Sequence, residues 1–503
     1  MTTRPDGYLG TDARILRGPA AELVEAGYAL EIADAPLLHR GLGLADLAHV
    51  LALREAGVVP PDAAAELLGA LLDILDTPAE RFPYDVMYGD AYNSRERELS
   101  RRLGAAAGWL HTGRTRREAG RIAFRLALRE RLLALHEAVG AFVTAIGTQA
   151  TVHADAVWAD TTYLQPAQPS TFGHYLGSFG EEAARHLDRL EHAHALADRS
   201  PAGAGGVGGS RVPLDRDALA GQLGFAAPGA HTRDAMWAVD GVADAVLAGT
   251  HAAITAERLA ADLEIFTSPG FDYVQLDASL CRASVLMPQK RNPYALAVIR
   301  AGAATLIGRA TGQLVTAHTP SARTDNWLHT YGESTGALDL ARRVVALAAE
   351  AVRTLRVDRA ALAAAAGAHF TGAADLAEEL VLRHGLDYRS AYRAVGRAVA
   401  TALDAGSHTL SAEDLARAAA DVLGTPVTVE PATIEAALDP ARIVTTRTVL
   451  GGSAPDRVRE HAATLQQRAG DAAAWRTHHR DYAEAALQRL VTTARAAART
   501  GCG

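Results

Sequence analysis

The stretch RIAFRLALRERLLALHEAVGAFVTAI, residues 121–146, decides the fold. Its apolar side chains recur with roughly i, i+3, i+4, i+7 spacing, which is the periodicity of one face of an α-helix. They are Ile122, Leu126, Leu133, Val139, Phe142 and Ile146. Because helices of globular proteins usually run about 8 to 20 residues, a longer pattern without a heptad seam predicts a bundle of long helices.

Helical periodicity dominates the rest of the chain, and β-alternation is scarce. Shorter amphipathic segments fill Ala21 to Leu75 and return after about Ala373. Further long helices are predicted at Ser170–Arg199, Arg233–Phe266, Pro293–Ala317 and Thr335–Leu355. We therefore expect an all-α fold with three helical domains. They are an N-terminal domain at residues 1–115, a central long-helix bundle at 116–370 and a small C-terminal domain at 371–503.

The composition excludes several classes of protein. Of the 503 residues, 49% are hydrophobic and 21% charged, which argues against a disordered or collagen-like chain. A net charge of −8 without a basic block argues against nucleic acid and anionic membranes as partners. The N-terminal MTTRPDGYLG lacks a signal pattern, and no apolar run reaches the length of a membrane span. We therefore expect a cytoplasmic protein.

The cysteines and a glycine-rich segment do not match the patterns of disulfide, metal or phosphate sites. Cys281 and Cys502 cannot form a disulfide framework, and the sequence offers no metal-ligand cluster, so no metal or cofactor is expected. The glycine-rich SPAGAGGVGGSRVP, residues 200–213, lacks the spacing of a phosphate-binding P-loop, and no strand precedes it. A flexible connection between two helices is the favoured interpretation of that segment.

One lysine stands out among the 50 basic residues, since all the others are arginine. It is Lys290, in the stretch SVLMPQKRNP at residues 284–293, just before the predicted helix at Pro293–Ala317. Lysine is a compact point charge that arginine does not replace. The backbone N–H groups of a helix start, the Lys290 ammonium and the Asn292 amide would form an anion site, with Ser284 beside it as a candidate base. The alternative is a capping turn in which Ser284 and Lys290 are incidental.

The stretch SVLMPQKRNP resembles the GSxxMPxKxNP signature of the fumarase/aspartase superfamily. LHTGRTRRE, residues 110–118, is similar to the LHTGRSRND segment of argininosuccinate lyases. TTYLQPAQPSTFGHYL, residues 161–176, is similar to their YTHLQRAQP segment. Because the three motifs occur in the expected order, the chain is identified as resembling the argininosuccinate lyase branch.

The resemblance implies three helical domains whose central ones form a twenty-helix core in a homotetramer, with each active site built from three subunits. It also implies a carbon–nitrogen lyase that acts on a small dicarboxylate by β-elimination and releases fumarate, without metal or cofactor. Such chemistry needs a base for a weakly acidic C–H and cationic stabilisation of the resulting carbanion.

Site residues follow by the same resemblance. Ser284 matches the catalytic base, and Lys290 and Asn292 match residues that hold a substrate carboxylate and the developing negative charge. Met287, from the same loop, is expected to contact substrate. The other substrate-binding candidates are Thr162 and Gln165 from the second motif and Thr115 and Arg116 from the first.

Four departures from the family pattern bear on the substrate. Ala283 stands before the serine where the family has glycine, and Arg117 replaces an asparagine, so that it either adds a cation to the substrate site or points into solvent. Tyr163 replaces a histidine linked to proton donation, and Ala297 replaces its glutamate partner. The paired loss indicates changed chemistry, in which Tyr163 donates the proton or the leaving group needs little protonation.

The leading hypothesis is a lyase for an N-substituted aspartate or similar succinate derivative in specialised metabolism. Residues 323–333 lack the tyrosine and glutamine of the family segment that recognises the arginine portion, so argininosuccinate is not the expected substrate. Nitrosuccinate, which gives fumarate and nitrite, would fit. The alternatives are argininosuccinate lyase proper, a carboxymuconate-type cycloisomerase, against which LHTGR argues, and a crystallin-like structural protein, against which the retained motif residues argue.

Four histidines complete the candidates. His111 and His174 are expected to be structural, whereas His231 and His329 could replace the missing acid.

Overall fold

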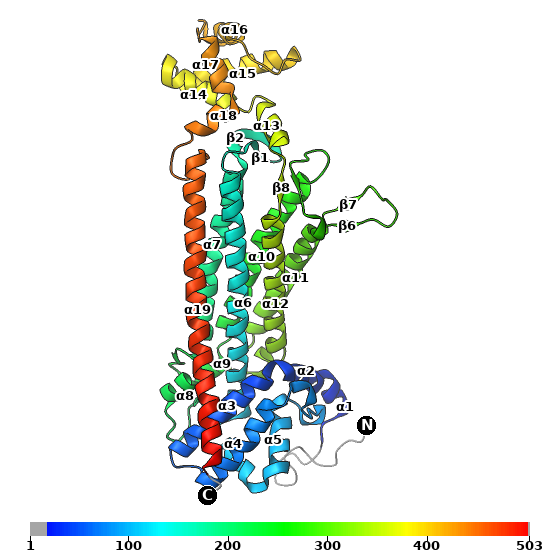
Figure 1. Ribbon diagram of the computed structural model, residues 1–503, viewed down its shortest axis with the longest axis vertical. Coiled ribbons are helices and arrows are strands. Elements are labelled where there is room, and N and C mark those ends of the chain that lie inside the picture. Colours follow the sequence, from blue (N-terminus) through cyan, green and yellow to red (C-terminus); the bar gives the residue numbers. More distant parts are fainter. Residues whose placement is uncertain (1–17, 501–503) are drawn as a thin grey trace.

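Six long helices run side by side along the molecule in the computed structural model, which describes residues 18–500 (Figure 1). The N-terminal decapeptide and Cys502 lie outside these residues. The bundle helices are α6 (Arg116–Val152), α7 (Phe172–Ala197), α10 (Asp240–Phe266), α11 (Tyr294–Ala317), α12 (Thr330–Arg353) and α19 (Pro455–Arg499). The all-α prediction is therefore confirmed.

The bundle helices approach closely because small residues line their contacts. A Cβ on Gly180 of α7 would lie 2.5 Å from a methyl carbon of Leu465 in α19 and 2.9 Å from one of Ile146 in α6. Real side chains do not approach this closely, so glycine is required for the three helices to meet there.

Shorter helices form a base at the lower end of Figure 1, and the start of α6 enters it. Their apolar side chains share one continuous core with the bundle. The base elements are α1 (Ala21–Leu23), the π-helical turn η2 (Val24–Tyr28), α2 (Ala29–Ala33), α3 (Ala35–Glu55), α4 (Pro61–Asp76), η3 (Ala79–Arg81), η4 (Val86–Tyr88), α5 (Ala91–Leu103) and η5 (Gly104–His111).

Short strands and turns connect the bundle helices. Three strand pairs are antiparallel: β1 (Val157–Thr162) with β2 (Gln165–Thr171), β5 (Val274–Gln275) with β8 (Arg356–Val357), and β6 (Arg282–Ala283) with β7 (Arg291–Asn292). The parallel pair is β3 (Arg199–Ser200) with β4 (Ala227–Pro228). The remaining connecting elements are α8 (Arg216–Gln222), α9 (Thr232–Trp237), η6 (Ala278–Leu280), η7 (Thr324–Asn326) and α13 (Arg359–Gly367).

A small helical unit at the upper end of Figure 1 has its own apolar core, which draws on α14 to α17. Its elements are α14 (Ala373–His384), α15 (Tyr388–Asp404), α16 (Ala412–Leu423), α17 (Pro431–Leu438) and α18 (Pro440–Thr446). The chain then returns to the bundle as α19, which packs on α6, α7 and α4. The segment expected as one C-terminal domain, 371–503, therefore divides between this small unit and the bundle.

Two predicted helices differ from the structure at specific residues. The helix expected at 233–266 is broken between α9 and α10, where Ala238 is extended. The Trp237 indole N–H donates to the Gly206 carbonyl at 3.1 Å, a tertiary contact that fixes the chain at this break. The helix expected to start at Pro293 starts at Tyr294, with Pro293 as its N-cap.

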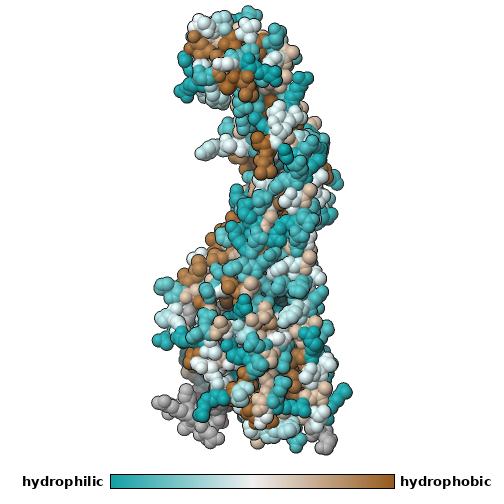
Figure 2. Space-filling view, turned by 90° about the vertical axis from the view of Figure 1, so that its left-hand side faces the viewer, coloured by the Kyte–Doolittle hydropathy of each residue, from teal (hydrophilic) through white to brown (hydrophobic). Residues whose placement is uncertain are grey.

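Helix α6 is long and apolar enough, by length and composition, to span a membrane, although no such segment was expected from the sequence. In the most apolar window of α6, 67% of the residues are buried inside the molecule, as in the core helix of a bundle. Figure 2 shows another face, which is largely hydrophilic along the middle of the molecule and has hydrophobic patches on the small unit at its upper end.

Candidate active site

The LHTGRTRRE segment, residues 110–118, leads from η5 into α6. Thr115 is the N-cap of α6, and its hydroxyl accepts a hydrogen bond from the Glu118 backbone N–H at 3.3 Å. The same hydroxyl donates to the Gly205 carbonyl at 3.4 Å. The candidate substrate-binding residue Thr115 thus also fixes where α6 begins.

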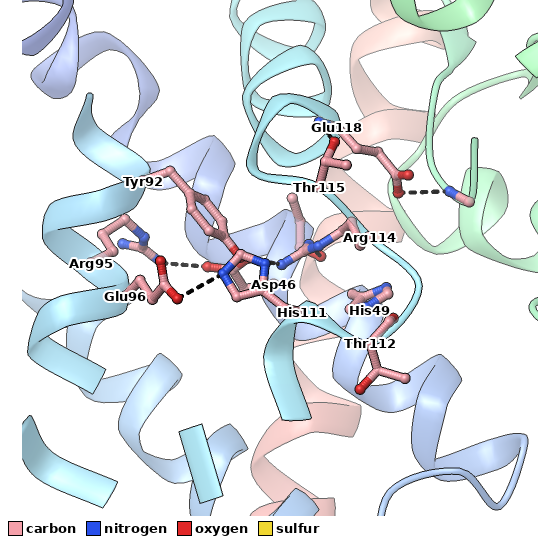
Figure 3. A network of polar contacts seen from close by, with 12 residues as sticks. Asp46, His49, Tyr92, Arg95, Glu96, His111, Thr112, Arg114, Thr115 and Glu118 are labelled. Atoms are coloured by element: carbon pink, nitrogen blue, oxygen red, sulfur yellow. Dashed lines mark hydrogen bonds and ion pairs between the residues drawn. The ribbon is translucent and has the colours of Figure 1, made fainter. Parts of the chain in front are cut away.

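A buried ionic network holds this segment in place (Figure 3). Asp46 of α3 is fully buried, and its two carboxylate oxygens accept hydrogen bonds from Arg114 at 2.5 Å and from Arg95 at 3.0 Å. Arg114 also donates to the Tyr92 hydroxyl at 3.0 Å and to the Ala45 carbonyl at 3.1 Å. The arginine of the motif therefore has a structural part, which anchors the start of α6 to the base.

Glu118 ties the glycine-rich segment 200–213 to the same motif. Its carboxylate accepts hydrogen bonds from the backbone N–H groups of Gly203 at 2.8 Å and Gly205 at 2.5 Å. Burial raises the pKa of Glu118 to about 7, against the lowering effects of Arg114 and these two hydrogen bonds. The segment expected to be a flexible connection is instead held against the first motif.

His111 supports the motif from its other side. Its Nε2 lies 2.9 Å from a carboxylate oxygen of Glu96 in α5 (Figure 3). The hydrogen bond that the His111 ring donates to Glu96 raises the pKa of His111, against the effect of burial. This geometry agrees with the expected structural role of His111.

Arg116 and Arg117 line a narrow cleft between the base and α12, together with Glu31, Asp90 and Tyr331. Arg117 forms an ion pair with Glu31 at 3.3 Å, and Arg116 one with Asp90 at 3.5 Å. Arg117 therefore neither points freely into solvent nor stands as an unpaired cation in the site. A substrate anion that contacted it would compete with Glu31.

The second motif forms the β1–β2 hairpin. Thr162 pairs with Gln165, which leaves Tyr163 and Leu164 as a two-residue turn. Both turn residues have positive φ, 54° and 60°, as a type I′ turn requires, although glycine or asparagine usually occupies these positions. The Tyr163 side chain is 98% exposed. Within residues 18–500, the predicted proton donor is therefore left uncovered.

The third motif forms the loop between β6 and β7, which projects from the side of the bundle in Figure 1. The Ser284 hydroxyl accepts a hydrogen bond from the Met287 backbone N–H at 3.1 Å. The backbone N–H of Lys290 donates to the Met287 carbonyl at 3.1 Å. The Asn292 side-chain amide donates to the Arg282 carbonyl at 2.9 Å. The loop is thus ordered internally while Lys290 and Met287 remain exposed.

The structure groups the candidate residues within each motif but does not bring the three motifs together in one chain. The first motif lies at the start of α6 and the second beyond its end. Since α6 has 37 residues at about 1.5 Å each, it is about 55 Å long. A small dicarboxylate cannot reach residues at both ends, so a site made from all three motifs needs more than one copy of the chain.

The other histidines have defined contacts. His174 lies between the Ser170 hydroxyl at 3.2 Å and the Gly451 carbonyl at 3.0 Å, which agrees with a structural role. His231 is the N-cap of α9, where its ring accepts from the Asp234 N–H at 3.5 Å. His329 is exposed just before α12.

Sequence reasoning missed two groups of residues. One is the Asp46 network, which joins residues 68 positions apart. The other is a cluster of His194, Asp198 and His479, whose potential ligand atoms lie within 4.8 Å of one another. The i, i+4 spacing of His194 and Asp198 was a local signal for this cluster, but the third member comes from a distant helix.

Comparisons with known proteins match nearly the whole chain. A family model described as Lyase matches residues 40–308, and one described as Argininosuccinate lyase C-terminal matches residues 370–445. An argininosuccinate lyase of Methanoculleus marisnigri is 30% identical over 90% of this chain and 92% of its own length. One of Halorhodospira halophila is 33% identical over 84% of this chain and 90% of its own length.

Solved structures agree. An EDDS lyase in complex with formate superposes with a TM-score of 0.85 at 26% identity, covering 96% of this chain and 97% of that one. An EDDS lyase variant with bound fumarate gives 0.86 at 27% identity, with the same coverage. Fold and comparisons together define a lyase. The chain belongs to the fumarase/aspartase superfamily, in its argininosuccinate lyase-like branch.

Proposed function

We propose that this lyase eliminates the substituent on the carbon next to a carboxylate-bearing CH₂ of a succinate derivative, and so releases fumarate. The observation that carries the proposal is the loop at residues 284–292, here called the serine loop. It is ordered by its own hydrogen bonds, projects from the bundle and holds the single lysine of the chain. Ser284, Lys290 and Asn292 lie on this one loop, between β6 and the start of α11.

In the proposed reaction, Ser284 removes a C–H proton next to one carboxylate. Lys290 and Asn292 stabilise the negative charge that develops on this carboxylate, and Met287 contacts the substrate beside them. The electron pair then forms the C=C bond as the leaving group departs with its own bonding electrons. Preorganised cationic donors are the largest source of stabilisation for such intermediates.

The second carboxylate is assigned to the other two motifs. Thr162 and Gln165 offer hydroxyl and amide groups next to the β1–β2 turn. Thr115 and Arg116 at the start of α6 complete the substrate contacts, with Arg117 beside them in the same cleft.

The assembly that this site needs is proposed to be a homotetramer. Helix α11 presents exposed apolar side chains on the part of its surface that is turned away from the core, at Val298, Ile307, Leu314 and Val315. Exposed apolar surface of this kind marks an interaction site. A second copy of the chain on this face would bury these side chains and place its own motif residues near the serine loop.

The proposed substrates are N-substituted aspartates and nitrosuccinate, in a cytoplasmic, specialised pathway. Ala297 cannot supply the carboxylate that a proton relay through Tyr163 would need. We therefore favour a leaving group that departs without such a relay. Nitrite is such a group. Argininosuccinate remains the second candidate because curated relatives carry that activity in their names.

The test is fumarate formation, followed by ultraviolet absorbance, with argininosuccinate, other N-substituted aspartates and nitrosuccinate. Turnover of at least one of them, lost in Ser284→Ala, supports the proposal. Light scattering should give a mass about four times that of the 52.8 kDa chain. Silence across the whole panel together with a monomer mass would contradict it.

A further inference from the structure

A histidine cluster lies between α7 and α19, away from the three motifs. His194 is in the last turn of α7, Asp198 is the C-cap of that helix, and His479 faces them from α19. The His194 and His479 ring centroids are 4.9 Å apart, and Trp475 packs on both rings. Because His194 and Asp198 are four residues apart, both side chains point to the same side of the chain.

His194 is buried with its polar atoms unused. The residue is 2% exposed, and neither ring nitrogen has a hydrogen-bond partner among residues 18–500. A buried polar atom left unsatisfied costs about 1–3 kcal/mol, so such a group in a folded protein calls for a missing partner. A neutral imidazole carries one N–H and one nitrogen lone pair, so the ring can serve as a metal ligand.

Asp198 supplies the negative charge of the cluster. Its Oδ1 forms an ion pair with Arg129 at 2.9 Å and accepts from the Ala226 N–H at 3.3 Å. These contacts orient the carboxylate, and one of its oxygens lies within 4.8 Å of a ring nitrogen of each histidine. The Arg129 guanidinium, which is paired with Asp198, opposes the binding of a further cation.

We propose that His194, Asp198 and His479 bind a divalent transition-metal ion of the zinc type, which joins the end of α7 to the middle of α19. Two imidazole nitrogens and a carboxylate oxygen form a donor set typical of zinc. Tetrahedral bonds of about 2.0–2.1 Å would place the ligand atoms about 3.4 Å apart. The ligand atoms, all within 4.8 Å of one another, would approach to this distance by side-chain rotation.

The role of this ion is structural. Since α19 follows the small C-terminal unit in the chain, the ion would fasten the returning helix to the bundle. The site goes beyond the proposed elimination reaction and does not depend on it, because none of the residues from the three motifs takes part.

The test uses the full chain, stripped of metal by chelation and titrated with Zn²⁺ in a calorimeter. We expect one zinc per chain and a higher unfolding temperature with zinc bound. Titration with Co²⁺ should give the visible absorption bands of a tetrahedral site.

Neighbouring histidines on α19 provide a matched pair of variants. His479→Gln removes a ligand and should weaken zinc binding by at least about tenfold, because even the loss of a group behind a ligand costs that much. His478→Gln changes the exposed neighbour and should leave zinc binding unchanged. No binding to the wild-type chain, or equal binding by the two variants, would overturn the proposal.

Discussion

Thr115 and Thr162 stand beyond opposite ends of α6, with all 37 residues of that helix between them. Both are candidate substrate-binding residues, and the helix between them is about 55 Å long. The chain therefore presents parts of its candidate site in separate places. Under the proposed function, each part completes a site in a different copy of the assembly.

Lys290→Arg tests whether the single lysine has a specific role. Arginine keeps the charge but replaces a compact ammonium with a planar fork that does not fit the same position. We expect turnover to fall by about 10²-fold or more, since preorganised charge contributes strongly to stabilising the transition state. The control is an unchanged assembly mass by light scattering. Near-normal turnover would show that retention of lysine here is incidental.

Tyr163→Phe separates the two accounts of the leaving group. If the hydroxyl donates a proton, its loss should lower kcat by about 10²- to 10⁴-fold. We expect a much smaller effect, because the phenylalanine ring fills the same place and no carboxylate at position 297 organises a relay. A large loss of kcat, with fumarate binding unchanged, would reverse this assignment and favour amine leaving groups.

Asp46→Asn tests the buried network behind the first motif. The change leaves the guanidinium groups of Arg95 and Arg114 buried without a full counter-charge, which should cost about 3–5 kcal/mol of unfolding free energy. The matched control is Asp76→Asn, which removes a surface ion pair to Arg495 whose side chains are more than half exposed. That control should cost less than about 1 kcal/mol. Urea unfolding at one chain concentration compares them, and equal losses would contradict the assigned role of Asp46.

His111 should make stability depend on pH. Its pKa in the folded chain is raised above 6.5 by Glu96, so its stabilising effect is complete below pH 6.5 and is lost as the pH rises through the folded pKa. Because both side chains are partly exposed, we expect an effect below about 1 kcal/mol. Glu96→Gln should bring the NMR titration of His111 back to lower pH. An unchanged titration would mean that Glu96 is not its partner in solution.

Sequence periodicity predicted the bundle where apolar side chains are large. The helix expected at 170–199 corresponds to α7 at Phe172–Ala197, whose start is set by the Thr171 cap. Helix α19, the longest in the described part of the chain, was missed because its buried stripe consists largely of alanine, as at Ala462, Ala469 and Ala472. Alanine gives little contrast with a polar background.

The sequence motifs of the site could be predicted, but the arrangement of their residues in space could not. Resemblance assigns roles to Ser284 and Lys290, yet their position on a projecting loop follows from the packing of α10 and α11. The pairing of Arg117 with Glu31 joins positions 86 residues apart, which no local pattern encodes. Such contacts are set by tertiary structure rather than by spacing.

The most direct test of the central claim, a lyase whose sites are shared between chains, is complementation between two inactive variants. Ser284→Ala and Thr162→Val alter different motifs, and each should be inactive or nearly so alone. After the two are unfolded and refolded together, random assembly should restore about a quarter of wild-type activity, because some sites then receive both unaltered motifs. No recovery in assemblies that demonstrably contain both variants would contradict the account.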